Sequence, residues 1–149
     1  MKHAIDIMTS TVITVRTDTP VRDVARIFTE NHISGVPVVD DQDKVIGIVT
    51  ESDLVFQNKR PSVPPFITIL DSFFFLDSPE KMDRELKKIA GTTVEDIFSS
   101  PVTSISPETP LDEIATLMTE KKIHTLPVLS ESGQMVGIVG KKDIIRTVL

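Results

Sequence analysis

The spacing of apolar residues changes several times along the first fifty residues, and each change predicts a short element. The β-branched run at 12–15 predicts a strand. Apolar residues at 21, 24, 25 and 28 then follow helical spacing, after a Thr19-Pro20 pair that suits an N-cap and a first helical residue. Runs at 36–39 and 45–49 predict two strands joined by a polar turn, with a helix after them. The predicted unit is β-α-β-β-α.

The same pattern recurs 90 residues later in the chain. When residues 6–53 are aligned without gaps to residues 96–143, 16 of the 48 positions are identical. A unit of about 50 residues is too short to bury a sufficient core alone. We therefore expect an α+β fold in which two β-α-β-β-α repeats pack sheet on sheet as a pseudo-twofold pair.

The repeat divides the chain into three parts: repeat 1 at 1–58, a connector at 59–92 and repeat 2 at 93–149. The connector contains the aromatic segment Phe66–Leu76 and a helical pattern that begins after Ser78. One interpretation is an ordered connector that packs on the pair. The other is that Phe73, Phe74 and Phe75 contribute to a dimer interface or a lid.

Composition excludes several classes of protein. The most hydrophobic segment, Phe66–Leu76, has eleven residues and contains Asp71, whereas a membrane helix needs about 20 apolar residues, and no signal peptide is evident. Zero cysteines exclude disulfides and thiolate metal sites, and three scattered histidines predict no metal centre. The formal charge of −6 argues against nucleic acid as a partner. A cytoplasmic protein that does not bind membranes is expected.

The most informative motif is GIVTESDL at 47–54, which becomes GIVGKKDI at 137–144. Thr50 and Asp53 have the spacing of a capping box, which would stabilise the start of a helix. A carboxylate at that place can also accept both hydroxyls of a ribose, with the threonine hydroxyl as a further polar contact. Gly140 has no side chain that could cap a helix, yet Asp143 is retained. This favours a binding role, more strongly for Asp53 than for Asp143.

Taken together, the hydrophobic-Pro-Val strand, the acidic turn and Gly-Ile-Val-Thr-x-x-Asp resemble the CBS domain. Two copies resemble a CBS pair, or Bateman module, over residues 4–57 and 94–149, as in stand-alone bacterial CBS-domain proteins. The resemblance implies two related clefts for a regulatory adenosine ligand: AMP, ADP, ATP or S-adenosylmethionine. It implies no required cofactor, a homodimer built on the helices at 51–58 and 141–148, and a regulated protein that the sequence does not identify.

The resemblance also implies site residues. In the first cleft, Thr50 and Asp53 would hold the ribose, while the second copy would supply phosphate contacts. The other residues implied for the first cleft are Thr11, Ile13, Ile33, Pro37, Lys122, His124 and Thr125. Those implied for the second cleft are Asp143, Thr103, Ile123, Ser34 and Gly35. Lys141 and Lys142 either form a solvated face or make the second cleft more attractive to a polyphosphate, and His124 is either a surface residue or a phosphate contact.

Three classes of function compete. The first is a regulatory module that senses an adenine nucleotide by a change of shape or of dimerisation. The second is a structural dimerisation module whose clefts stay empty. The third is a nucleotide-hydrolysing enzyme, for which the sequence offers no P-loop, no nucleophile elbow and no metal-spaced cluster. The sensor is the interpretation that we favour, and no catalytic residue is expected.

Overall fold

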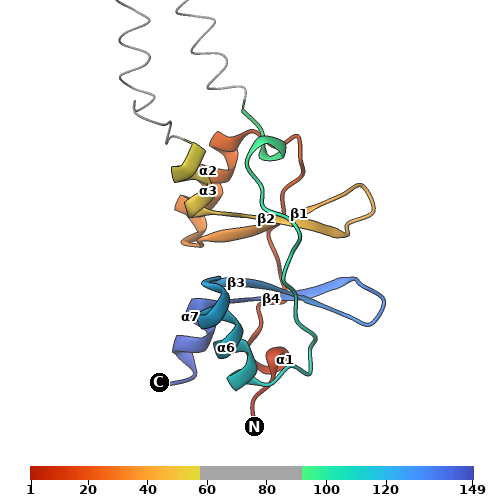
Figure 1. Ribbon diagram of the computed structural model, residues 1–149, viewed down its shortest axis with the longest axis vertical. Coiled ribbons are helices and arrows are strands. Elements are labelled where there is room, and N and C mark those ends of the chain that lie inside the picture. Colours follow the sequence, from red (N-terminus) through yellow and green to blue (C-terminus); the bar gives the residue numbers. More distant parts are fainter. Residues whose placement is uncertain (58–91) are drawn as a thin grey trace, which may run out of the picture.

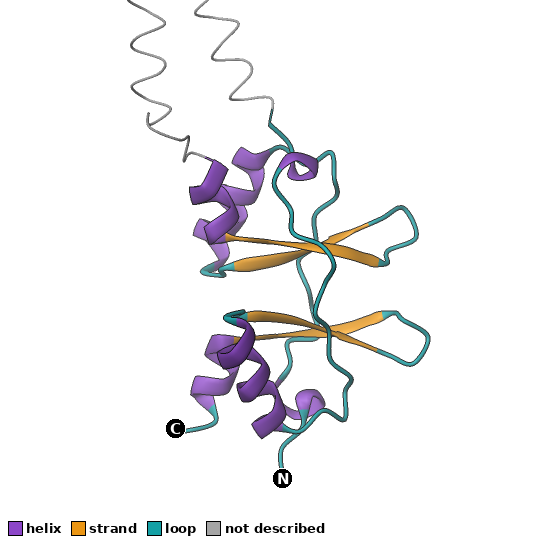
Figure 2. Cartoon of the chain, viewed as in Figure 1, coloured by secondary structure: helices purple, strands orange, loops and turns teal. Residues whose placement is uncertain are grey.

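Figure 1 shows the computed structural model of the chain, in which residues 1–57 and 92–149 are described. Two β-hairpins face each other across the middle of the molecule, and the helices of each half lie on the far side of its own hairpin (Figure 2). The hairpins approach each other through β1 and β3. The predicted pseudo-twofold pair of α+β repeats is therefore present.

Each element of the first half has a counterpart in the second. The strands are β1 (Gly35–Val39) and β2 (Val45–Thr50), with β3 (Thr125–Leu129) and β4 (Met135–Gly140). The helices are α2 (Val21–Asn31) and α3 (Glu51–Gln57), with α6 (Leu111–Lys121) and α7 (Lys141–Arg146). Two short helices precede the halves, α1 (Ala4–Ile7) and η1 (Val94–Asp96).

The helices form where the sequence predicts an apolar face, and that face covers the hairpin. Val24 and Phe28 of α2 are buried, as are Ile114 and Met118 of α6. Both helices end with a residue in the left-handed conformation, His32 after α2 and Lys122 after α6. The chain therefore turns at equivalent points and enters β1 and β3 in the same way.

The two hairpins are antiparallel and carry a register shift at equivalent positions. Pro37 lies opposite Ile48, and the backbone of Ile48 bonds to Ser99 instead, with N···O distances of 3.1 and 2.9 Å. The missing N–H of the proline therefore costs no bond to β2. Along its other edge β1 has one bridge partner among the described residues, Val15 opposite Val38, which is close to the edge position that the proline predicts.

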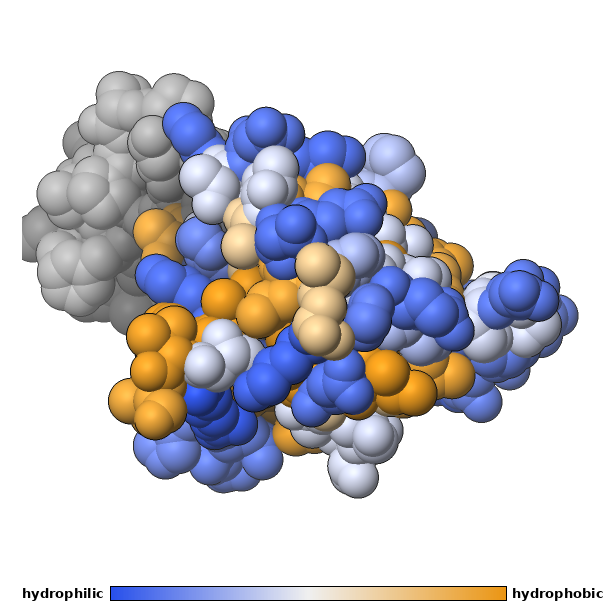
Figure 3. All heavy atoms as spheres, turned by 90° about the horizontal axis from the view of Figure 1, so that it is seen from below, coloured by the Kyte–Doolittle hydropathy of each residue, from blue (hydrophilic) through white to orange (hydrophobic). Residues whose placement is uncertain are grey.

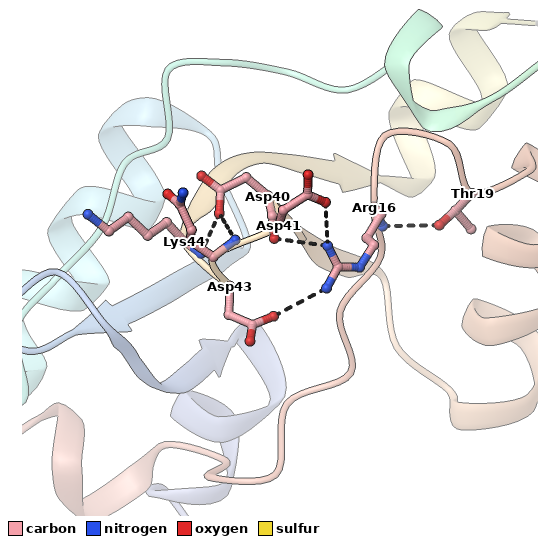
Figure 4. A network of polar contacts seen from close by, with 7 residues as sticks. Arg16, Thr19, Asp40, Asp41, Asp43 and Lys44 are labelled. Carbon is pink, nitrogen blue, oxygen red and sulfur yellow. Dashed lines mark hydrogen bonds and ion pairs between the residues drawn. The ribbon is translucent and has the colours of Figure 1, made fainter.

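The turn between β1 and β2 is held by side chains (Figure 4). Oδ1 of Asp40 accepts the backbone N–H groups of Lys44 and Gln42, at 3.0 and 2.8 Å. These bonds hold the pKa of Asp40 below its ordinary value. Nη1 of Arg16 donates to the carbonyl oxygen of Asp40 and to Oδ1 of Asp41, at 3.1 and 3.2 Å. The segment before α2 is thereby tied to the hairpin.

Each of the two short helices packs against the half formed by the other repeat: α1 against the second half and η1 against the first. Ala4 of α1 is fully buried in the core of the second half, where it joins Ile114 and Leu126. Val94 of η1 is fully buried in the core of the first half, with Val24. Each repeat therefore completes the core of the other, and in Figure 1 two chain segments run between the halves.

Two local predictions were wrong. Residues 12–15 do not form a regular strand, since Val15 alone makes a parallel bridge, with its N–H bonded to the Pro37 carbonyl at 3.0 Å. The preceding residues cross from the other hairpin, where Thr9 bridges Ile138. Thr19 does not cap α2, because its hydroxyl oxygen accepts the N–H of Arg16 at 3.0 Å. Predictions for the connector concern residues outside the described part of the chain.

Gly35 and Thr125 mark the point where the two halves meet. They are equivalent positions of the repeat, and residues related by a twofold can touch each other only near its axis. A Cβ atom built on Gly35 would lie 2.5 Å from Oγ1 and 3.0 Å from Cβ of Thr125. The glycine therefore leaves the room that the threonine occupies, and the axis itself is asymmetric in sequence.

Candidate ligand-binding cleft

A cavity of about 300 Å³ lies between the two halves. It is lined by residues of both repeats, from the ends of β2 and α6, the starts of α3 and β3, and the crossing segment at 99–103. The lining residues are Ser34, Ile48, Thr50, Glu51, Ser52, Ser99, Pro101, Val102, Thr103, Lys122, Ile123, His124 and Thr125. Its size is at the lower end of the range for small-molecule sites.

One wall of the cleft is built around Asp53. Oδ2 of Asp53 accepts the backbone N–H of Thr50 at 2.8 Å and its hydroxyl at 3.2 Å. Oδ1 accepts the hydroxyl of Ser99 at 3.2 Å, so the carboxylate joins the two repeats. Asp53 does not itself line the cavity, but both of its hydroxyl partners do.

The bond between Asp53 and the Thr50 N–H is a general device of this fold. Asp6, Asp96 and Asp143 likewise accept the N–H of the residue three positions earlier, at 2.8, 3.1 and 2.7 Å. The capping interpretation of the motif is therefore correct for one oxygen of each carboxylate. What distinguishes Asp53 is its second oxygen, Oδ1, which accepts the hydroxyl of Ser99 beside the cavity.

The opposite wall is formed where α6 ends. Lys122, in the left-handed conformation, turns the chain so that Ile123, His124 and Thr125 follow along the cavity. Lys122 and His124 are both exposed. The wall thus combines an apolar side chain with basic side chains, and the acidic residue Glu51 lines the same cavity.

Segment 99–103 reaches the cleft because it pairs with the other repeat. Ser99 bridges Ile48 of β2 before the chain returns to its own half at Ile105, which bridges Val128. The approach is close, since a Cβ atom on Gly47 would lie 2.9 Å from the carbonyl oxygen of Ser99 and would collide with the ring of Phe98. The glycine of the motif therefore makes room for the crossing segment.

The structure brings together half of the residues that the sequence indicated. Those that line the cavity are Thr50, Ser34, Thr103, Lys122, Ile123, His124 and Thr125, with Asp53 bonded to two of its walls. Those that do not line it are Thr11, Ile13, Ile33, Gly35, Pro37 and Asp143.

The expected division into two clefts needs one correction. Thr103 and Ile123 were assigned beside Asp143, but they lie in the cavity with Thr50. Thr11, Ile13 and Ile33 are the repeat equivalents of Pro101, Thr103 and Ile123, which line that cavity, so the repeat predicts them beside Gly140 and Asp143 instead. The cause is the crossing of the segments before α2 and α6, which the repeat pattern alone does not reveal.

Ser99 is the functional candidate that sequence reasoning missed. Nothing in its surroundings (IFSSPV) separates it from an ordinary turn serine. Ser52 and Glu51 were also left out of the predicted site, although they stand inside the motif. Their place in the chain, directly after β2, would have been a usable signal.

The described residues contain neither a metal-binding cluster nor a helix suited to a membrane. Within residues 1–57 and 92–149, no group of three or more His, Cys, Asp or Glu side chains is placed to hold a metal ion. Over the same residues, no helix combines the length and the apolar character that a membrane span requires.

The fold and the cleft define a class of protein: a tandem repeat whose two copies exchange segments and enclose a site between them. The CBS domain family model matches residues 4–59 and 94–149. The chain belongs to the CBS domain family and contains two CBS domains.

Similar proteins include an uncharacterized protein of Methanocaldococcus jannaschii, MJ1426, which is 29% identical over 151 residues, covering 97% of this chain and 89% of that one. The chloroplastic CBS domain-containing protein CBSX2 of Arabidopsis thaliana is 29% identical over 139 residues, and the match covers 91% of this chain but 58% of that protein.

Two solved structures have the same fold as this chain. CBSX2 in complex with AMP has a TM-score of 0.71 at 23% identity, covering 99% of this chain and 96% of that one. The CBS domain pair of MJ0100, in complex with 5′-methylthioadenosine and S-adenosyl-L-methionine, has a TM-score of 0.70 at 23% identity with the same coverage. The expected CBS-pair fold is confirmed.

Proposed function

We propose that this protein is a regulatory module that binds an adenosine ligand in the cleft between its repeats. The observation that carries the proposal is the arrangement of the two walls. Asp53, with hydroxyl groups on both of its oxygens, stands on one side, and Lys122 and His124 stand on the other. Such a cleft suits a ligand with a diol at one end and an anionic group at the other.

The carboxylate of Asp53 is available for a diol because its capping role uses only one oxygen. Oδ1 accepts the hydroxyl of Ser99, an exposed side chain that can rotate away. A ribose hydroxyl can replace that bond, while the Thr50 N–H keeps Oδ2 and the carboxylate in place. A charged acceptor makes this bond stronger than one between neutral groups.

The rest of the cavity suits the remaining parts of an adenosine ligand. Ile48, Val102 and Ile123 provide apolar surface for a purine ring, and Lys122 and His124 can meet a phosphate or a carboxylate. The complexes of CBSX2 with AMP and of MJ0100 with two adenosine compounds support this ligand class.

The regulatory part of the proposal rests on the origin of the lining residues. Because both repeats line the cavity, a bound ligand contacts both and favours one arrangement of the pair. In a dimer, two copies of the chain would respond to that arrangement because they would contact each other through α3 and α7. Val55 of α3 and Ile145 of α7 are 69% and 53% exposed, and Val148 after α7 is exposed too. Figure 3 shows the molecule from below, the end away from α3, and there apolar side chains lie between polar ones.

Calorimetric titration with AMP tests the proposal. We expect saturable binding by the wild type and a loss of about tenfold or more for Asp53→Ala, since a hydrogen bond to a charged group contributes about 1.5–3 kcal/mol. Asp96→Ala is the matched control, because Asp96 accepts an equivalent capping bond from Thr93, which does not line the cavity, whereas Asp53 bonds to Thr50 and Ser99, which do. Equal losses in both variants would show that only helix capping had been disturbed.

A structural dimerisation module is the second candidate, and the exposed apolar residues of α3 and α7 favour it. It predicts that AMP, ATP and S-adenosylmethionine leave the melting temperature unchanged, while light scattering still shows a dimer. A ligand at 100 times its dissociation constant would instead add about 2.7 kcal/mol of stability. Release of phosphate from ATP that Asp53→Ala abolishes would support the third candidate, a hydrolase.

A further inference from the structure

The two clefts of the pair differ at the residue that follows the helix start. Ser52 lines the cavity in the first cleft, and its repeat equivalent is Lys142. Likewise Lys122 lines the first cleft, and its equivalent is His32. In the first cleft the short serine and the lysine both line the cavity.

In the second cleft the long side chain of Lys142 extends from the start of α7 to the end of α2. Nζ of Lys142 donates to the backbone carbonyl oxygen of His32 at 2.7 Å, and this bond joins residues 110 positions apart. His32 is the C-cap of α2, where carbonyl groups point out of the helix without partners and carry partial negative charge. An ammonium group is favoured there. Lys142 therefore links the start of α7 to the end of α2.

Both carboxylate oxygens of Asp143, the acidic residue of the second cleft, already have partners within the protein. Oδ2 of Asp143 accepts the N–H of Gly140 at 2.7 Å, and Oδ1 lies 3.6 Å from Nη1 of Arg146. The Asp143 side chain is only 11% exposed. Asp53 has the hydroxyl of Ser99 where Asp143 has a guanidinium group, and Gly140 supplies no hydroxyl at all.

We propose that Lys142 closes the second cleft against ligands, so that each chain binds one adenosine ligand, in the cleft of Thr50 and Asp53. This inference rests on the function proposed above for the first cleft. It gives Lys142 a role within the protein in place of the polyphosphate contact suggested by the sequence. The charge reversal between the two motifs then separates a binding cleft from a closed one.

The stoichiometry of AMP binding tests this inference by calorimetry. We expect one AMP per chain for the wild type and for Lys141→Ser, which removes the same charge from the neighbouring residue; both lysines are exposed, but the bond to the His32 carbonyl is made by Lys142. Lys142→Ser, which installs the residue of the first cleft, should bind a second AMP about threefold to tenfold more weakly than the first, since Gly140 offers no hydroxyl. Adding Gly140→Thr should tighten that second event.

Two results would overturn the inference. One is two equal sites in the wild type, and the other is a single site in both Lys142→Ser and the double variant. The first binding event reports whether each variant is folded. If no AMP binds to the wild type, the proposed function fails for this ligand, and the closing bond is tested without ligand by acylation of lysines followed by mass spectrometry. Lys142 should then react more slowly than Lys141, and equal rates would refute the bond.

Discussion

The contact between Gly35 and Thr125 predicts that alanine at position 35 will destabilise the protein. The added Cβ atom would lie 2.5, 3.0 and 3.2 Å from Oγ1, Cβ and Cγ2 of the threonine. Rotation of the threonine about χ1 cannot relieve this overlap, because its Cβ atom does not move. The two hairpins must separate instead, and overpacking of this kind costs about 1–3 kcal/mol.

Urea denaturation and thermal melting measure the effect. For a chain of this size, 1 kcal/mol corresponds to about 2–4 °C in melting temperature, so a fall of roughly 2–12 °C is expected for Gly35→Ala. The informative control is the exchange Gly35→Thr with Thr125→Gly, which moves the same atoms to the other side of the axis. It should recover most of the stability that Gly35→Thr alone loses. A double variant no more stable than that single variant would refute the idea that the axis contact imposes the glycine.

Other predictions concern the turn, the core and the crossing segment. Asp40→Ala should melt below the wild type at pH 7. The difference should shrink as the pH falls below about 4, because a depressed carboxyl pKa gives a contribution that is full above the unfolded value and lost at lower pH; a constant difference would contradict this. Ile114→Ala, at a fully buried position, should cost about 2–5 kcal/mol in urea denaturation, against about 0.5 or less for the exposed Ile5→Ala. Gly47→Ala should weaken AMP binding as well as stability, because it displaces Ser99 from the cleft; unaltered affinity would count against the role of that segment.

The repeat made most of the fold predictable. A pattern that occurs twice restricts the number of arrangements, so the hairpins, the two main helices and the faces with Val24 and Ile114 could be read from the sequence. The first predicted strand failed because the chain crosses there from one hairpin to the other, with Thr9 bridging Ile138 and Val15 bridging Val38. A strand that touches each partner at one position has the composition of a strand without its regular bonding.

The sequence predicted many of the residues that line the cavity, but it assigned some of them to the wrong one of the two clefts. Thr50, Lys122 and His124 were expected together and line one cavity. Thr103 was placed in the other cleft, because equivalent segments of the two repeats have equivalent apolar patterns. Ala4 and Val94 are apolar and would be equally stable in the core of either half. The pattern therefore predicts that they are buried, but it does not predict in which half. Only the spatial path of the chain decides this.

The exchange of α1 and η1 has a consequence for the order in which the protein can assemble. Residues 4–8 are synthesised well before the side chains of 105–139 that bury them, so during synthesis they have no permanent partner. Native contacts of such long sequence separation slow folding. In a concentrated refolding mixture, α1 of one molecule can meet the second half of another with the same contacts. Intertwined dimers would then form without a single new interaction.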